Sequence, residues 1–225
     1  MEERVKSIFL ELGADLCGIA NVDRFSGAPA GFNPTDIYSE CKSVIVFARR
    51  MPRGTACVNP RIVYNKANDM NLEELDRIGF AASIEVEKLG CTAVPVPSDS
   101  PYEYWDSDKM EGRGILSMRH AALLAGLGSL GKNTLLINKK YGNMINIGAV
   151  LTTLDLKSDP LSEEMCISSC RLCLNSCPQK ALDAQTVNQK LCRQYAYGSN
   201  KRGYSVCNCN SCRIVCPRAF GLRED

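Results

Sequence analysis

The sequence lacks the features that mark membrane, secreted, fibrous and disordered chains. No apolar run approaches the ~20 residues that a membrane helix requires, and residues 1–13 contain no apolar core of a secretory signal peptide. The composition, 45% hydrophobic and 23% charged over 225 residues, excludes disorder, collagen and coiled coil. We therefore expect a globular cytoplasmic protein with no membrane partner, built as one large domain or as a main domain with a smaller one.

Histidine and tryptophan are scarce, with one residue each, and the net charge is only +2. So small a net charge gives no indication of a nucleic-acid partner, and we expect none. Cysteine stands out instead, with 13 residues, nine of which lie between positions 166 and 216. In a reducing cytoplasm, clustered cysteines bind metal more often than they form disulfides. The other four, Cys17, Cys41, Cys57 and Cys91, are scattered among apolar residues and are expected in the core.

The clustered cysteines follow a repeated pattern. Cys170-x2-Cys173-x3-Cys177-Pro178 is echoed by Cys209-x2-Cys212-x3-Cys216-Pro217. In two-cluster ferredoxins, the cysteine that precedes proline ligates the other cluster. This crossed rule predicts two [4Fe–4S] clusters with these ligands: Cys166, Cys170, Cys173 and Cys216 for the first, and Cys177, Cys192, Cys209 and Cys212 for the second.

Two alternatives remain for this pattern. A pair of structural zinc sites would explain each C-x2-C pair, but not the x3-Cys-Pro ending of both copies. Cys166 precedes Cys170 by three intervening residues instead of the usual two, so Cys207 is the alternative fourth ligand of the first cluster.

Charge is distributed unevenly along the chain. Residues 166–225 contain nine Lys and Arg but only three Asp and Glu. A solvated basic segment that touches RNA is one interpretation. We favour another, in which the surplus cations offset the negative charge of iron–sulfur clusters with four thiolates each.

Hydrophobic periodicity predicts alternating helices and strands before the cysteines, and hence an α/β or α+β layer domain over residues 1–155. Residues 155–165 are expected to be a linker, and residues 98–114 a loop. The prolines in 91–97 indicate an edge strand. The expected helices span 3–12, 34–40, 68–89 and 116–127, and the expected strands span 16–22, 43–48, 91–97, 134–138 and 145–154.

A glycine-rich loop matches G-x-G-x-x-G and, except at its last position, the P-loop pattern. Both motifs require a strand before the loop and a helix after it, because the helix N-terminus receives the phosphates. Here a helix is expected before and a strand after, so we expect no nucleotide. The glycines would instead permit close approach of another strand or of a flat cofactor. The residues of this loop are Gly126, Gly128, Ser129, Gly131, Lys132 and Asn133.

The run from Ala125 to Ile137, followed by Tyr141-Gly142 and the doubled Cys-Pro pattern, resembles the epoxyqueuosine reductases. Similar architecture occurs in the reductive dehalogenases. The resemblance implies a nitroreductase-like domain over residues 1–155 and a bacterial-ferredoxin-like domain with two clusters over residues 156–225. It also implies cobalamin near the glycine loop, electrons from a donor such as ferredoxin or flavodoxin, and an oxidoreductase activity.

Two other functions remain open. The chain could be a two-cluster electron carrier that reduces a partner, such as a corrinoid protein, without cobalamin of its own. A zinc-stabilised RNA-binding module is a remote alternative, because the basic segment has few aromatic residues for stacking.

A corrin-dependent reduction also needs a proton donor beside the substrate. Asp99, Tyr102 and Tyr104 lie in the polar segment 98–114, and Asp99 is the nearest match to the family's catalytic Asp; an exposed loop with solvated carboxylates is the alternative. His120 shares the apolar stripe of its helix, where it would be an acid, a ligand or a hydrogen-bonded core residue. We predict a corrinoid cavity walled by residues 98–105 and 126–133.

Overall fold

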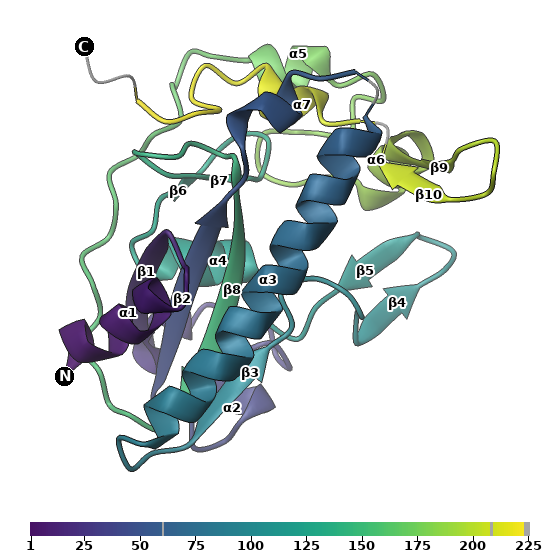
Figure 1. Cartoon of the computed structure of the whole chain (residues 1–225). Helices are drawn as coiled ribbons and strands as arrows, with labels where there is room; N and C mark the ends of the chain where they lie inside the picture. The colour runs from purple at the N-terminus through teal and green to yellow at the C-terminus, as the bar shows by residue number, and fades with distance from the viewer. Residues whose placement is uncertain (60, 208, 223–225) are drawn as a thin grey trace.

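The computed structural model describes residues 1–59, 61–207 and 209–222. At its centre is an antiparallel sheet in the order β1-β2-β8-β3, made of β1 (Leu16–Asn21), β2 (Ser43–Arg50), β8 (Ile145–Thr152) and β3 (Ala93–Val96) (Figure 1). Every residue of β8 is buried, which explains its almost unbroken apolar sequence. The predicted edge position of the proline-containing strand is confirmed, because β3 is the last strand of the sheet.

Helices cover both faces of this sheet. The helices α1 (Glu2–Glu11) and α3 (Ile62–Glu87) pack on one face, and α4 (Met118–Leu124) packs on the other (Figure 1). Because side chains alternate along a strand, Ile45 and Phe47 join the core under α1 and α3, while Val44 and Val46 join the core under α4. The mixed α/β layer predicted from the sequence is confirmed.

The segment after β8 belongs to this layer as well. The Asp159 amide donates to the Ile19 carbonyl at 2.9 Å, and the Asp159 carboxylate accepts from the Ile19 amide at 2.9 Å. Lys6 forms an ion pair with Asp159 at 2.9 Å, and Leu156 is buried. These contacts cover the free edge of β1, where backbone groups would otherwise be unpaired. Residues 156–159 of the predicted linker are therefore a packed part of the fold.

Two short hairpins complete the first part of the chain. One, β4 (Tyr104–Asp106) with β5 (Glu111–Arg113), lies in the segment expected to be a loop. The other, β6 (Ser129–Leu130) with β7 (Leu136–Ile137), carries the glycine-rich loop. The remaining short elements are η1 (Val22–Phe25), α2 (Pro34–Ile37) and η2 (Arg53–Ala56). The helix predicted over 68–89 is α3, which begins earlier, at Ile62.

The cysteine-rich segment gathers at one end of the sheet (Figure 1). Its elements are α5 (Leu172–Ser176), α6 (Gln189–Ala196), β9 (Tyr197–Ser199), β10 (Ser205–Cys207) and α7 (Ser211–Ile214), and α5 packs against α7. Among the helices of the described residues, none is long and apolar enough to cross a membrane.

Candidate functional site

Four cysteines line one small pocket, whose volume is about 20 Å³. Two of them belong to the first copy of the repeat, and a third precedes that copy by four positions. The fourth is the cysteine before proline in the second copy. Residues 131–133 of the glycine-rich loop close the same pocket. The structure thus brings together the set that the crossed rule assigned to one centre: Cys166, Cys170, Cys173 and Cys216.

Two thiols of this first group have a raised pKa. Burial raises the pKa of Cys173, and the nearby Cys166 and Cys170 raise it further. Burial also raises the pKa of Cys216, although a hydrogen bond from the Arg218 backbone opposes the shift. The Cys173 and Cys216 thiols are therefore neutral unless a positive group joins them. A metal centre that takes them as thiolates must displace their protons.

A second group of four cysteines forms around α6 and α7. Burial raises the pKa of Cys212 to about 11, and the neighbouring Cys192, Cys209 and Cys177 contribute to the shift. Burial also raises the pKa of Cys192, and the neighbouring Cys177, Cys209 and Cys207 contribute to that shift. Cys207 lies beside this second group, where its Sγ donates to the Cys209 carbonyl at 3.5 Å. Cys207 therefore lies with the second group, whereas the sequence left it as an alternative ligand of the first.

Zinc is the alternative to iron–sulfur clusters for these two groups. Within residues 1–59, 61–207 and 209–222, no three His, Cys, Asp or Glu side chains converge closely enough to hold one metal ion. Structural zinc requires four sulfurs at about 2.3 Å from one centre. The preference for iron–sulfur clusters over zinc rests on the x3-Cys-Pro ending of both repeats.

The glycine-rich loop holds the cysteine-rich segment in place. Lys132 Nζ donates to three carbonyls, those of Ile167 at 3.0 Å, Ser168 at 2.6 Å and Cys170 at 3.1 Å. These bonds use all three ammonium protons and fix the turn between two cysteines of the first group.

Two further side chains of the loop act in the same way. Asn133 is buried and donates to the Cys212 carbonyl at 2.9 Å, which ties the loop to the second group. Ser129 Oγ accepts from the Met165 amide at 2.8 Å, immediately before the first cysteine of the segment. The loop is therefore a brace between the sheet domain and both cysteine groups.

The glycines of the loop approach the chain itself. Gly126 has a φ of +74°, and a Cβ there would lie 2.1 Å from the Pro160 carbonyl oxygen. A Cβ on Gly128 would lie 2.4 Å from the Ile137 carbonyl oxygen, and one on Gly131 would lie 2.8 Å from the Ile137 side chain. The space that the missing side chains leave is therefore filled by a strand and by residue 160. Of the two neighbours that the sequence left open for these glycines, a strand or a flat cofactor, the structure shows the strand and residue 160.

Two of the predicted proton donors, Asp99 and Tyr102, contact each other and pack against α6. The Tyr102 hydroxyl donates to Asp99 Oδ1 at 3.2 Å. The Arg193 guanidinium lies over three rings, at 5.3 Å from Tyr102, 5.2 Å from Trp105 and 5.5 Å from Tyr197. Although the Asp99 residue is exposed, atoms crowding its carboxylate raise its pKa. The Asp99–Tyr102 pair is thus fastened to α6, whose Cys192 belongs to the second group.

The other two predicted acids lie elsewhere. Tyr104 is 47% exposed and packs on Phe32 at 5.3 Å. His120 is exposed and hydrogen-bonded to Ser117 Oγ through Nδ1 at 2.7 Å, so it is not the core residue that the apolar stripe of its helix suggested. Partial burial and the adjacent Arg119 lower its pKa. Among the described residues, no hydrogen bond links His120 or Tyr104 to the Asp99–Tyr102 pair.

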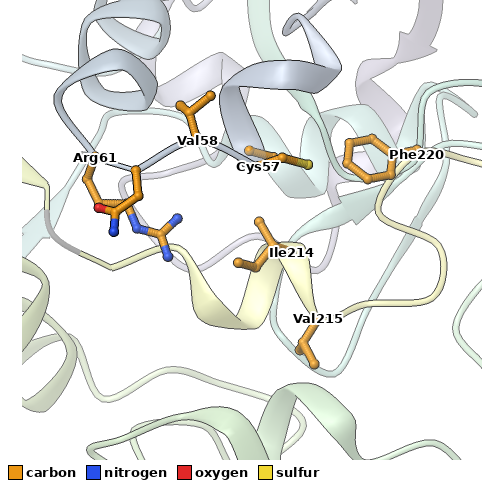
Figure 2. Close-up of a pocket in the computed structure, with 8 residues that line it drawn as sticks. Cys57, Val58, Arg61, Ile214, Val215 and Phe220 are labelled. Carbon is orange, nitrogen blue, oxygen red and sulfur yellow. The ribbon is translucent and has the colours of Figure 1, made fainter.

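The larger of the two pockets, about 580 Å³, lies where the sequence gave no signal. Figure 2 shows Cys57, Val58 and Arg61 on one side of it, facing Ile214 and Val215. Its lining is Ala56, Cys57, Val58, Asn59, Arg61, Ile214, Val215 and Phe220. Residues 98–105 line neither of these two pockets, so the cavity wall predicted for that segment stays a prediction.

This larger pocket lies against the segment that joins the two cysteine groups, although neither Cys212 nor Cys216 lines it. Its floor is the turn between Cys212 and Cys216, one of which belongs to each group. Arg61, on its wall, donates to Asn210 Oδ1, and Arg53 stacks on the Phe220 ring at 5.7 Å. These contacts join residues more than 140 positions apart, which is why periodicity and spacing could not reveal them.

No protein-family model matches the chain. An epoxyqueuosine reductase from Gloeobacter violaceus is 31% identical over 175 residues, covering 72% of this chain and 48% of the relative. A tetrachloroethene reductive dehalogenase from Desulfitobacterium hafniense is 25% identical over 224 residues, covering 91% of this chain and 36% of the relative. The chain thus spans about half or less of these curated relatives.

Solved structures extend the similarity to the fold. An epoxyqueuosine reductase from Streptococcus thermophilus matches with a TM-score of 0.68 at 19% identity, over 100% of this chain and 68% of that one. A catabolic reductive dehalogenase matches with a TM-score of 0.72 at 17% identity, over 99% of this chain and 32% of that one. The chain is therefore a homologue of the epoxyqueuosine reductases and the reductive dehalogenases, with which it shares a mixed α/β fold.

Proposed function

We propose that the chain is a two-cluster iron–sulfur oxidoreductase of the epoxyqueuosine-reductase type. It passes low-potential electrons through two [4Fe–4S] clusters to a corrinoid or to a bound substrate. The observation that carries this proposal is the sorting of eight cysteines into two groups of four. The first group takes Cys216 from the second repeat and the second takes Cys177 from the first, as crossed ligation requires.

The donor set and its surroundings fit such clusters. Lys132 and Arg218 line the first group's pocket, whose lining contains no Asp or Glu. A cluster with four thiolates is anionic, and these two cations offset its charge. When bound, the clusters supply one-electron transfer. The residues of this chain provide the thiolates, brace the turns that carry them and neutralise the charge. In this proposal residues 1–155 are nitroreductase-like and residues 156–225 are ferredoxin-like.

The larger pocket is our candidate for the electron acceptor's site. Its apolar lining and the polar end of Arg61 suit a mostly apolar ligand with a few polar groups. Because Ile214 and Val215 line it, a corrinoid or substrate in it would lie against the segment that joins Cys212 of one group to Cys216 of the other. Relatives support this class of chemistry: a reductive dehalogenase structure concerns B12-dependent dehalogenation. Another relative, an epoxyqueuosine reductase, has been solved with a modified tRNA stem loop, whereas for this chain the absence of a nucleic-acid partner stays a prediction.

Anaerobic titration of the cluster-loaded protein with cobalamin tests this assignment. We expect a dissociation constant of about 1 μM or tighter, which corresponds to about −8 kcal/mol, with a change in the corrin absorption bands. Ile214→Trp should abolish binding because it fills the pocket. Phe80→Trp is the matched control, since Phe80 is 63% exposed on α3 and does not line the pocket.

A two-cluster electron carrier is the second candidate, favoured by the glycine-rich loop. The positions that side chains would take at Gly126, Gly128 and Gly131 are occupied by the chain itself, so these glycines do not face a cofactor. If the loaded protein binds no cobalamin but still reduces a separate corrinoid protein, the carrier function replaces the first proposal. The partner that supplies electrons is, in both proposals, a ferredoxin- or flavodoxin-like donor.

A further inference from the structure

Arg218 carries a buried donor that the protein leaves unused. Its side chain lines the pocket of the first cysteine group. Within the described residues, its Nε is buried without a hydrogen-bond partner, and no Asp or Glu forms an ion pair with it. A buried N–H without an acceptor costs free energy, so such a group in a native structure requires an explanation.

The other cation in the pocket cannot supply this role. All three ammonium protons of Lys132 are donated to carbonyls of residues 167, 168 and 170. Lys132 therefore contributes charge and holds the turn, but has no proton left to donate. The Arg218 Nε–H is the donor that remains available to an acceptor inside the pocket.

The backbone of Arg218 is already engaged. Its amide donates to Cys216 Sγ, and its carbonyl accepts from the Gly221 amide at 3.2 Å. These bonds do not depend on the identity of the side chain. A substitution at 218 can therefore change the side-chain donor while the backbone around Cys216 keeps its hydrogen bonds.

We propose that Arg218 donates its Nε–H to a sulfur of the cluster in this pocket and raises the reduction potential of that cluster. This inference rests on the proposed function. The cluster accepts one electron from the ferredoxin- or flavodoxin-like donor, no bond is broken, and its negative charge grows by one. A hydrogen bond to sulfur and a nearby cation both stabilise the more negative state, so both favour reduction.

The test is an anaerobic redox titration of the loaded protein, followed by electron paramagnetic resonance so that the two clusters are resolved. Arg218→Met removes both donor and charge, and we expect the first cluster's reduction equilibrium to become at least tenfold less favourable. For a one-electron couple, tenfold corresponds to a shift of about 59 mV. Arg218→Lys keeps the charge and should show a smaller shift. The second cluster should keep its potential in both variants.

Arg202→Met is the matched control, because Arg202 is exposed in the turn between β9 and β10. It should leave both potentials unchanged. Full iron content with unchanged potentials in Arg218→Met would overturn the inference alone. Loss of the first cluster in both Arg218→Met and Arg218→Lys would show a structural role and would also overturn it. A wild-type protein without iron would instead overturn the proposed function.

Discussion

Gly142→Ala should separate the first cysteine group from the rest of the fold. Gly142 has a φ of +64°, and a Cβ there would lie 2.2 Å from the Arg218 carbonyl oxygen and 2.3 Å from that of Ala219. Both carbonyls belong to the segment that follows Cys216. Because backbone cannot yield as a flexible side chain does, the substitution must push this segment away from the sheet domain.

The cost has two parts. A non-glycine residue in the left-handed region costs about 1–2 kcal/mol, and overpacking against fixed neighbours adds about 1–3 kcal/mol. We therefore expect Gly142→Ala to lower the free energy of unfolding by about 2–5 kcal/mol. Gly90→Ala isolates the first part, since Gly90 has a φ of +84° with nothing within 4 Å of a Cβ. Gly27→Ala, with open space and no positive φ, should be close to neutral.

Anaerobic urea unfolding, followed by circular dichroism, measures the three free energies, and iron analysis with electron paramagnetic resonance reports the clusters. We expect Gly142→Ala to lose the first cluster preferentially, because only that group contains Cys216. Gly90→Ala should keep both clusters. The reasoning is refuted if Gly142→Ala matches Gly90→Ala in stability and retains full iron.

Three further outcomes are expected. Cys173→Ser and Cys212→Ser should each deplete a different cluster, while Cys207→Ser should deplete neither, as judged by iron content and resonance spectra; loss of iron in Cys207→Ser would contradict the grouping. Because its pKa is raised, Asp99 contributes stability that is present below the unfolded pKa of about 4 and is lost as the pH rises through its folded pKa. Asp99→Asn should therefore flatten the pH dependence of urea unfolding above pH 4, and an unchanged profile would contradict this. Arg193→Leu should expose the β4–β5 hairpin to limited proteolysis and lower the free energy of unfolding by about 1–2 kcal/mol. Cation–π contacts are worth about 0.5–1 kcal/mol each and are not additive. Equal cleavage rates of wild type and variant would show that Arg193 does not hold the hairpin in place.

The sheet could be predicted because its signals are local. Residues 44–48 are apolar throughout because β2 is buried on both faces, and Pro95 restricts its strand to the edge. The grouping of the cysteines could also be predicted, because both copies share the spacing C-x2-C-x3-C-P, to which the rule of crossed ligation applies. The structure then places Cys216 with the first group, although 43 positions separate it from Cys173.

The rest depends on contacts without a local pattern. Three-residue strands such as Tyr104–Asp106 are too short to show alternation, so the hairpin in 98–114 could not be predicted. The stacking of Arg193 on Tyr102 joins residues 91 positions apart. His120 shares its helix stripe with buried residues, but α4 is only seven residues long and leaves that side chain exposed. Periodicity indicates a face, whereas the neighbour that covers the face is decided by tertiary packing.

The most direct measurement is metal and sulfide analysis of protein purified anaerobically, combined with electron paramagnetic resonance after reduction. Two four-iron clusters require about eight iron and eight sulfide per chain, with two resolvable reduced signals. We predict this stoichiometry and negligible zinc. Two zinc ions per chain without sulfide would contradict the central claim.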